Sequence, residues 1–210
     1  MELAFERRGS GEPLILVHGI GHHRRTWLPV LDRLAAARTV IAVDLPGFGA
    51  SAGLPEPIPY TAESLADAVE SFCVRLGVRE PHVAGHSLGG YIALELASRG
   101  VVRTATALSP VGFWTRPELL YYRTVLRAMR ASARYGGFAP TLESFGGLMP
   151  PGPPKSPVTI AWGEHDRLLP RRQAVRAARW SGQRVKLLKG CGHVPMSDDP
   201  ELVARVILEE

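Results

Sequence analysis

Six short runs of mostly apolar residues recur along the chain. They cover residues 13–17, 39–43, 82–85, 104–108, 158–162 and 184–188. Unbroken apolar runs, as opposed to a strict alternation of apolar and polar positions, are typical of parallel strands that are covered on both faces. Residues 2–6 alternate instead, which predicts an edge strand at the start of the chain.

Helical spacing of apolar residues fills most of the segments between these runs. The clearest example has apolar side chains at positions 65, 68, 69, 72, 73 and 76, with Thr61 as a candidate N-cap and Gly77 as a stop. Near the end of the chain, Asp199 and Pro200 mark the start of a last helix. Strands that alternate with helices predict an α/β fold, with a doubly wound, mostly parallel sheet and helices on both faces.

The alternation breaks between residues 112 and 156. A predicted helix starts at Pro117 and carries on one face the apolar residues Leu119, Tyr122, Leu126 and Met129. Eight of the twelve residues 146–157 are Gly or Pro, which excludes regular structure there. We therefore predict a core formed by residues 1–111 and 157–210.

Residues 112–156 are then a small helical insertion that roofs the site as a lid. Trp114 and Tyr122 are its candidate pocket residues, because both lie on or just before the apolar face of the predicted helix. The alternative is that this helix face packs on the core and lines no pocket. Both alternatives stay open at this point.

The composition indicates the number of domains and the class of protein. The chain has 210 residues, of which 45% are hydrophobic and 21% charged, as in an ordinary globular protein of one domain. The chain contains no stretch of about 18 uninterrupted apolar residues, so no membrane span is predicted. The first eight residues have no apolar segment of a signal peptide, so we expect a cytoplasmic protein. The oligomeric state is left open.

The charge balance is basic, with a formal net charge of +5. Only three of the 25 basic residues are lysines, and the arginines occur as scattered pairs such as Arg7–Arg8 and Arg24–Arg25. No dense basic run is interleaved with aromatic residues, so we predict a solvated surface and neither a nucleic-acid nor a membrane partner. The two cysteines, Cys73 and Cys191, are too few for a disulfide framework, and Cys73 is expected to be a buried free thiol.

The strongest chemical signal is the segment Gly85–Gly89, which has the pattern G-x-S-x-G. It follows one apolar run and precedes a helical segment, which is the context that a nucleophile elbow requires. The sharp turn exposes the Ser87 hydroxyl at the start of a helix, where backbone N–H groups favour a developing negative charge. Ser87 is therefore the candidate nucleophile.

A nucleophilic serine needs a base and a group that orients the base. His193 follows the sixth apolar run, and Asp166 follows the fifth. Together with Ser87 they lie beyond the carboxyl ends of predicted parallel strands, where open α/β sheets form their sites. Glu164 is a rival acid two residues before Asp166, and we favour Asp166 because it lies at the tip of the loop.

The remaining polar loops supply two backbone donors and no metal site. The segment His18–Gly21 surrounds Ile20 with glycines, so the N–H groups of Ile20 and Leu88 are the candidate oxyanion donors. His18, His22 and His23 have no carboxylate or cysteine at ligand spacing, so we predict no metal ion and no cofactor.

The ordered set of motifs resembles that of the α/β-hydrolase fold. The matching segments are His18–Gly21 followed by Trp27, Asp44–Ser51, Gly85–Gly90, Gly163–Asp166 and Gly192–Pro195. The resemblance covers nearly the whole chain and implies Ser87 as nucleophile, His193 as base and Asp166 as the residue that orients the base. It implies no catalytic role for Asp44. Members of this family often run longer, with a multi-helix lid in the position of residues 112–156, so we expect a reduced lid or a shortened variant of a longer parent. Only one clear strand precedes Leu14, which predicts a trimmed sheet edge.

These residues predict a serine hydrolase that forms an acyl-enzyme from a small, fairly apolar carboxylic ester. Serine at the elbow argues against haloalkane dehalogenases and epoxide hydrolases, whose relatives have aspartate there. The same residues also suit C–C bond hydrolases, lactonases, acyltransferases and perhydrolases. A hydrolase-fold protein that binds a ligand and barely turns it over is an alternative of a different class.

Overall fold

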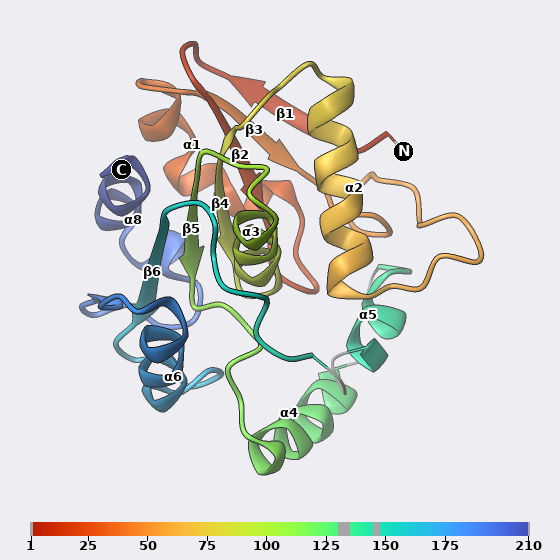
Figure 1. Ribbon diagram of the computed structural model, residues 1–210, viewed down its shortest axis with the longest axis vertical. Helices are drawn as coiled ribbons and strands as arrows, with labels where there is room; N and C mark the ends of the chain where they lie inside the picture. The colour runs from red at the N-terminus through yellow and green to blue at the C-terminus, as the bar shows by residue number, and fades with distance from the viewer. Residues whose placement is uncertain (1, 130–134, 145–147, 210) are drawn as a thin grey trace.

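A computed structural model describes residues 2–129, 135–144 and 148–209 of the chain. Strands and helices alternate along it, and the strands form one sheet of seven (Figure 1). The strands are β1 (Phe5–Arg8), β2 (Pro13–Val17), β3 (Thr39–Val43), β4 (His82–His86), β5 (Thr104–Leu108), β6 (Val158–Gly163) and β7 (Lys186–Leu188). The helices are the 3-10 helix η1 (Arg24–Trp27), α1 (Leu28–Ala35), α2 (Ala62–Arg75), α3 (Leu88–Arg99), α4 (Arg116–Met129), α5 (Phe138–Ser144), α6 (Arg171–Ser181), α7 (Pro195–Asp198) and α8 (Pro200–Leu208).

The sheet has the order β1-β3-β2-β4-β5-β6-β7, and every neighbouring pair is parallel except β1 with β3. The predicted doubly wound, mostly parallel sheet is therefore confirmed. The predicted edge strand at residues 2–6 is shifted and lies at Phe5–Arg8, in register with Val43 to Val40 of β3. Ala4 continues this pairing through its carbonyl, which accepts the Asp44 N–H at 2.8 Å, whereas its N–H donates to the Ser51 hydroxyl at 2.9 Å.

Two hydrophobic clusters lie on opposite faces of the sheet. Along β2, Ile15 and Val17 belong to the larger cluster, and Leu14 and Leu16 to the smaller one. Because neighbouring strand residues point to opposite faces, a continuous apolar run supplies both clusters at once. Helices α2, α3 and α6 cover the larger cluster, and α1, α7 and α8 cover the smaller one.

The predicted helix ends are confirmed where the structure shows their caps. The Thr61 side chain accepts from the Ser64 N–H at the start of α2, and Gly77 follows that helix with φ +68. The Asp199 side chain accepts from the Leu202 N–H at the start of α8. These local bonds satisfy N–H groups that the first turn of a helix leaves without a partner.

The chain between β5 and β6 forms α4, α5 and an extended return. Figure 1 shows α4 and α5 beyond the carboxyl ends of the central strands. The return segment, residues 148–157, then runs between α3 and α6. The indole N–H of Trp180 in α6 donates to the Pro151 carbonyl at 2.8 Å, and the Lys155 N–H donates to the Ala97 carbonyl in α3 at 2.9 Å. A Gly/Pro-rich strip of chain thus covers this part of the sheet.

No helix in the described residues has the length and apolar character needed to cross a membrane. The side chains of Leu126 and Met129, which are predicted on the apolar face of α4, lie outside the described part of the chain.

Candidate active site

Ser87 lies in a sharp turn between β4 and α3. Its backbone has φ 55 and ψ −112, a left-handed conformation that costs energy for any residue with a side chain. A Cβ atom at Gly85 would lie 1.9 Å from the Gly89 carbonyl oxygen, and one at Gly89 would lie 2.1 Å from that of Val17. The two glycines of the motif are therefore required for the close backbone packing that holds Ser87 in this turn.

Ser87, His193 and Asp166 come together at the carboxyl ends of β4, β7 and β6. The Ser87 Oγ is 3.3 Å from His193 Nε2, and His193 Nδ1 is 2.8 Å from Asp166 Oδ2. Because Nδ1–H donates to the carboxylate, Nε2 is left to accept the proton of the serine hydroxyl. The structure brings together the three side chains that the motifs indicate, although they are 106 and 27 residues apart in sequence.

The Asp166 carboxylate is buried and fully hydrogen-bonded. Its Oδ1 accepts the backbone N–H groups of Leu168 at 2.9 Å and Leu169 at 2.7 Å, and its Oδ2 faces His193. Glu164, the rival acid, turns to a different loop, where it accepts the Gly190 N–H at 3.1 Å. The geometry therefore gives His193 only one carboxylate partner among the described residues.

His86 is a site residue that the sequence analysis did not single out. It has no exposed surface, and its Nε2–H donates to the backbone carbonyl of His193 at 2.6 Å. Its Nδ1 is buried and has no hydrogen-bond partner in the described part of the chain. Burial lowers the pKa of His86 well below that of a free histidine, so the ring is neutral. This hydrogen bond ties the loop of His193 to the strand of Ser87.

The two candidate oxyanion donors border the nucleophile. Leu88 is the first residue of α3, and the Gly19 backbone next to Ile20 packs so closely on Ser87 that a Cβ at Gly19 would lie 3.1 Å from the serine Cβ. The N–H groups of Ile20 and Leu88 donate to no acceptor among the described residues. Both are therefore available to a negative oxygen beside Ser87.

The first strand–helix loop is held by buried polar groups. His18 donates from Nδ1 to the Gly19 carbonyl at 2.8 Å and accepts at Nε2 from the Leu45 N–H at 3.0 Å. Burial lowers the pKa of His18 to about 4, so this bridge is neutral. The buried Asp44 carboxylate pairs with Arg24 and accepts the Ala50 N–H at 2.8 Å. These contacts hold the Asp44 loop against the segment that contains Arg24.

A metal site is not supported by the described residues. No group of three or more His, Cys, Asp or Glu side chains among them has the geometry to hold an ion. His18 has both ring nitrogens engaged with the backbone, which removes it from any histidine cluster.

Trp114 and Tyr122 contact each other and pack against the core. Their rings are 6.2 Å apart, and the Trp114 indole N–H donates to the Leu148 carbonyl at 3.1 Å. Tyr122 is only 3% exposed and belongs to the larger hydrophobic cluster. Burial is the main cause that raises its pKa to about 12, with smaller effects of Glu118 and Asp166.

Phe138, at the start of α5, is a second residue that the sequence analysis missed. It is 4% exposed, and its ring would lie 3.2 Å from a Cβ at Gly21, directly after the Ile20 loop. An apolar ring beside the candidate oxyanion donors is suited to contact an apolar substrate.

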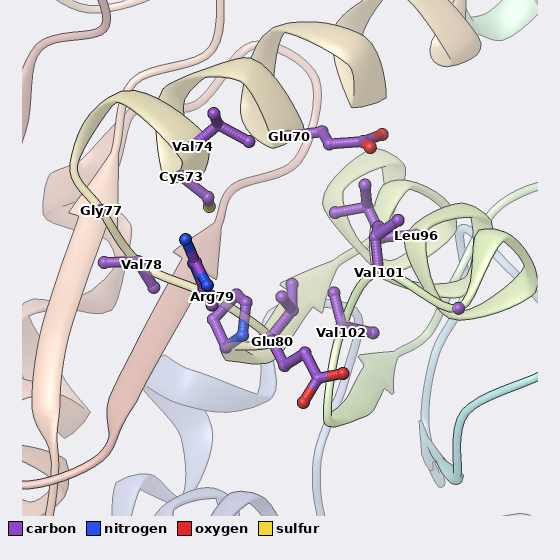
Figure 2. Close-up of a pocket in the computed structure, with 13 residues that line it drawn as sticks. Glu70, Cys73, Val74, Gly77, Val78, Arg79, Glu80, Leu96, Val101 and Val102 are labelled. Atoms are coloured by element: carbon purple, nitrogen blue, oxygen red, sulfur yellow. The ribbon is translucent and has the colours of Figure 1, made fainter.

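A separate cavity of about 490 Å³ lies at the other end of the sheet. Figure 2 shows it between Cys73 and Val74 of α2, Val78 of the following loop, and Leu96 of α3. None of the three clustered side chains at the candidate active site lines it. Burial raises the pKa of the Cys73 thiol to about 12, so this thiol is protonated and unreactive at neutral pH.

Comparison with known proteins gives the same fold and a family. The sequence profile of the alpha/beta hydrolase family matches residues 14–146 and again residues 111–206. Among solved structures, a thermophilic esterase from Thermogutta terrifontis with bound malate superposes with a TM-score of 0.84 at 24% identity, over 99% of this chain and 92% of that one. At this identity the likeness shows the fold alone.

Two curated relatives illustrate the range of similar sequences. The chain is 30% identical over 236 residues to the dihydrolipoyllysine-residue acetyltransferase component of the acetoin cleaving system of Cupriavidus necator, over 92% of this chain and 62% of that protein. It therefore spans less than two thirds of that relative. It is 37% identical over 100 residues to the pimeloyl-[acyl-carrier protein] methyl ester esterase of Aeromonas salmonicida, over 46% of this chain and 36% of that protein.

Proposed function

The chain belongs to the alpha/beta hydrolase family, and on that premise we propose that it is a hydrolase that cleaves small, fairly apolar carboxylic esters through an acyl-enzyme on Ser87. The observation that carries the proposal is the hydrogen-bonded series Ser87–His193–Asp166, with distances of 3.3 and 2.8 Å. Similar relatives named as esterases support the choice of ester.

The first half of the proposed reaction acylates the enzyme. Ser87 Oγ attacks the ester carbonyl while His193 Nε2 takes its proton, and Asp166 stabilises the imidazolium through Nδ1–H. The tetrahedral oxyanion accepts hydrogen bonds from the N–H groups of Ile20 and Leu88. His193 then passes the proton to the leaving alkoxide, which departs as the alcohol.

The second half releases the acid. A water molecule gives a proton to His193 Nε2 and attacks the acyl carbonyl, and the same two N–H groups hold the second oxyanion. Collapse of this intermediate returns the proton to Ser87 Oγ and frees the carboxylic acid. None of these steps requires a cofactor or a metal ion, because the acid, base and nucleophile are all side chains of this chain.

The division of the chain into a core and a lid is part of the proposal. Residues 1–111 and 157–210 form the core, and residues 112–156 form a reduced lid over the carboxyl ends of the strands. Trp114 and Tyr122 then contribute to the apolar wall of the acyl pocket and to the core at the same time. The apolar surroundings of the site favour an uncharged acyl group.

Turnover of a chromogenic ester series tests this proposal. We expect p-nitrophenyl esters of short and medium acyl chains to be hydrolysed over many turnovers, and Ser87→Ala to lose at least about a thousandfold in kcat. A matched control is Ser98→Ala, since the Ser98 hydroxyl donates only to the Glu95 carbonyl on α3. A single turnover in the parent would indicate a ligand-binding protein, and near-native rates in Ser87→Ala would refute the nucleophile.

A further inference from the structure

The positive charge of this protein is concentrated in one segment. Residues 167–197 contain eight of the 25 basic residues and none of the 20 acidic ones. The remaining 179 residues carry 17 basic and 20 acidic side chains, a formal charge of −3. The basic balance of the whole chain therefore comes from α6, β7 and their flanking loops. Scattered arginine pairs elsewhere in the chain make this asymmetry hard to see in the sequence.

Most of these cations are exposed and have no counter-ion. Arg172 and Arg176 pair with Glu118, and Lys186 pairs with Glu209. The other five are exposed or at the rim, and none lies within ion-pair distance of a carboxylate in the described ranges: Arg167, Arg171, Arg179, Arg184 and Lys189. Exposed cations without a counter-ion produce an outward positive potential that attracts anionic partners, and two of these five, Arg171 and Arg184, line the same groove.

A shallow groove of about 510 Å³ runs through this flank, between α6 and β7. Its floor is apolar and includes Val175 and Leu187, which are 53% and 37% exposed. Arg171 and Arg184 stand at its rim. Cations around an aliphatic floor match a partner that combines acidic and aliphatic side chains.

The groove also borders an open sheet edge. β7 is the last strand in the order and pairs only with β6 within the described sheet. The Leu188 carbonyl accepts the Glu164 N–H on the β6 side, so by alternation the backbone groups of Leu187 face outward. An extended peptide can use such groups, and its alternate side chains can enter the groove.

The lining of the groove favours a protein segment over nucleic acid or a membrane surface as the anionic partner. Single-stranded nucleic acid needs exposed aromatic rings for stacking, and none of the residues that line the groove is aromatic. A membrane surface is contacted by protruding aromatic and large aliphatic side chains, whereas this groove is lined by aliphatic and arginine side chains without an aromatic ring. An acidic, partly aliphatic segment of a protein satisfies the charge, the groove and the open edge together.

We propose that the groove between α6 and β7 is a docking site for an extended protein segment in which acidic and aliphatic residues alternate. The acidic side chains pair with Arg171 and Arg184, and the aliphatic ones cover Val175 and Leu187. This surface is separate from the Ser87 site, so the proposal holds or fails independently of the proposed ester hydrolysis.

Fluorescence anisotropy with a defined probe tests the docking site. The probe is a labelled ten-residue peptide of alternating Glu and Val, and the control peptide has Lys in place of Glu. The full chain is compared with Arg171→Glu/Arg184→Glu and with Arg25→Glu/Arg75→Glu, which changes the net charge equally on other surfaces. Circular dichroism and ester turnover verify that each variant is folded.

We expect the Glu/Val peptide to bind, with affinity that falls between about 50 mM and about 300 mM salt. The Arg171→Glu/Arg184→Glu variant should weaken binding by about tenfold or more, and the control variant by less than about twofold. Val175→Ser should weaken it by about threefold, since apolar contact also contributes. Absence of binding, or equal weakening in both double variants, would overturn the proposal. Tighter binding of phosphatidylserine vesicles or of an oligonucleotide at the same arginines would overturn the partner class.

Discussion

The hydrogen bonds around Asp166 determine how the substitution Asp166→Asn affects catalysis. Oδ1 accepts two backbone N–H groups, from Leu168 and Leu169. In the Asn variant the amide oxygen must take this position, because an NH₂ group there would face two donors. The NH₂ group is then directed at His193 Nδ1 and donates to it. The proton of His193 is forced onto Nε2, which can no longer accept the proton of Ser87.

The expected loss is large and confined to catalysis. A histidine base held in the wrong tautomer costs about 10⁴ in kcat in the chymotrypsin-type enzymes, which corresponds to about 5.5 kcal/mol of transition-state stabilisation. The shape of the side chain and both backbone hydrogen bonds are retained, so KM should change by less than about threefold. The melting temperature should change little compared with the loss of rate.

The matched control is Glu164→Gln. Glu164 is two residues away and has a 31% exposed side chain, and its carboxylate accepts the Gly190 N–H and not His193. We expect its kcat to stay within about threefold of the parent, since the amide oxygen can still accept that hydrogen bond. Steady-state hydrolysis of one p-nitrophenyl ester by the three proteins decides the matter. An Asp166→Asn rate within tenfold of the parent, or a larger loss in Glu164→Gln, would refute the reasoning.

Three further predictions concern residues around the site. Burial lowers the pKa of His18 to about 4 in the folded chain. As the pH falls, the unfolded chain therefore binds a proton at this histidine first, at a pH of about 6.5. The free energy of unfolding should drop by about 3 kcal/mol between pH 6.5 and pH 4. Urea unfolding at pH 7 and pH 4.5 should show a smaller drop in His18→Gln, and equal drops would contradict the burial argument. His86→Leu should lower kcat by about ten- to a hundredfold with KM unchanged, because the His193 carbonyl loses its hydrogen-bond donor. His86→Gln should restore part of the rate, because its amide can donate to the same carbonyl. Equal kinetics in both variants would exclude a positioning role. Trp114→Ala should shift the preferred acyl length in an ester series, and an unchanged profile with a large fall in melting temperature would leave Trp114 as a packing residue only.

Much of the fold could be predicted from local patterns, because a parallel sheet imposes a simple requirement on sequence. A strand such as β2 is covered on both faces, so every position is apolar and the run is visible without alignment. The edge strand is less visible in the sequence, since β1 is largely exposed and alternates weakly, and its position at Phe5–Arg8 depends on pairing with β3. Register is a property of two strands together and is not encoded in either alone.

In the candidate site, too, some residues are marked by local motifs, whereas others depend on contacts between distant segments. Ser87, Asp166 and His193 are marked by local motifs at strand ends, and the structure places His193 within hydrogen-bonding distance of both Ser87 and Asp166. His86 and Phe138 act through contacts with distant segments, so no local pattern could show what they touch. The presence of His inside the G-x-S-x-G motif was a signal for the first, but its partner is a carbonyl 107 residues away.

Labelling with a fluorophosphonate probe, followed by mass spectrometry of the digested chain, tests the central claim most directly. Such a probe reacts with a serine only where a base activates the hydroxyl and donors stabilise the developing oxyanion. The account predicts one adduct per chain, on Ser87, with labelling strongly slowed in Asp166→Asn and unchanged in Glu164→Gln. An adduct on a different serine, or an unlabelled chain that still hydrolyses esters, would contradict it.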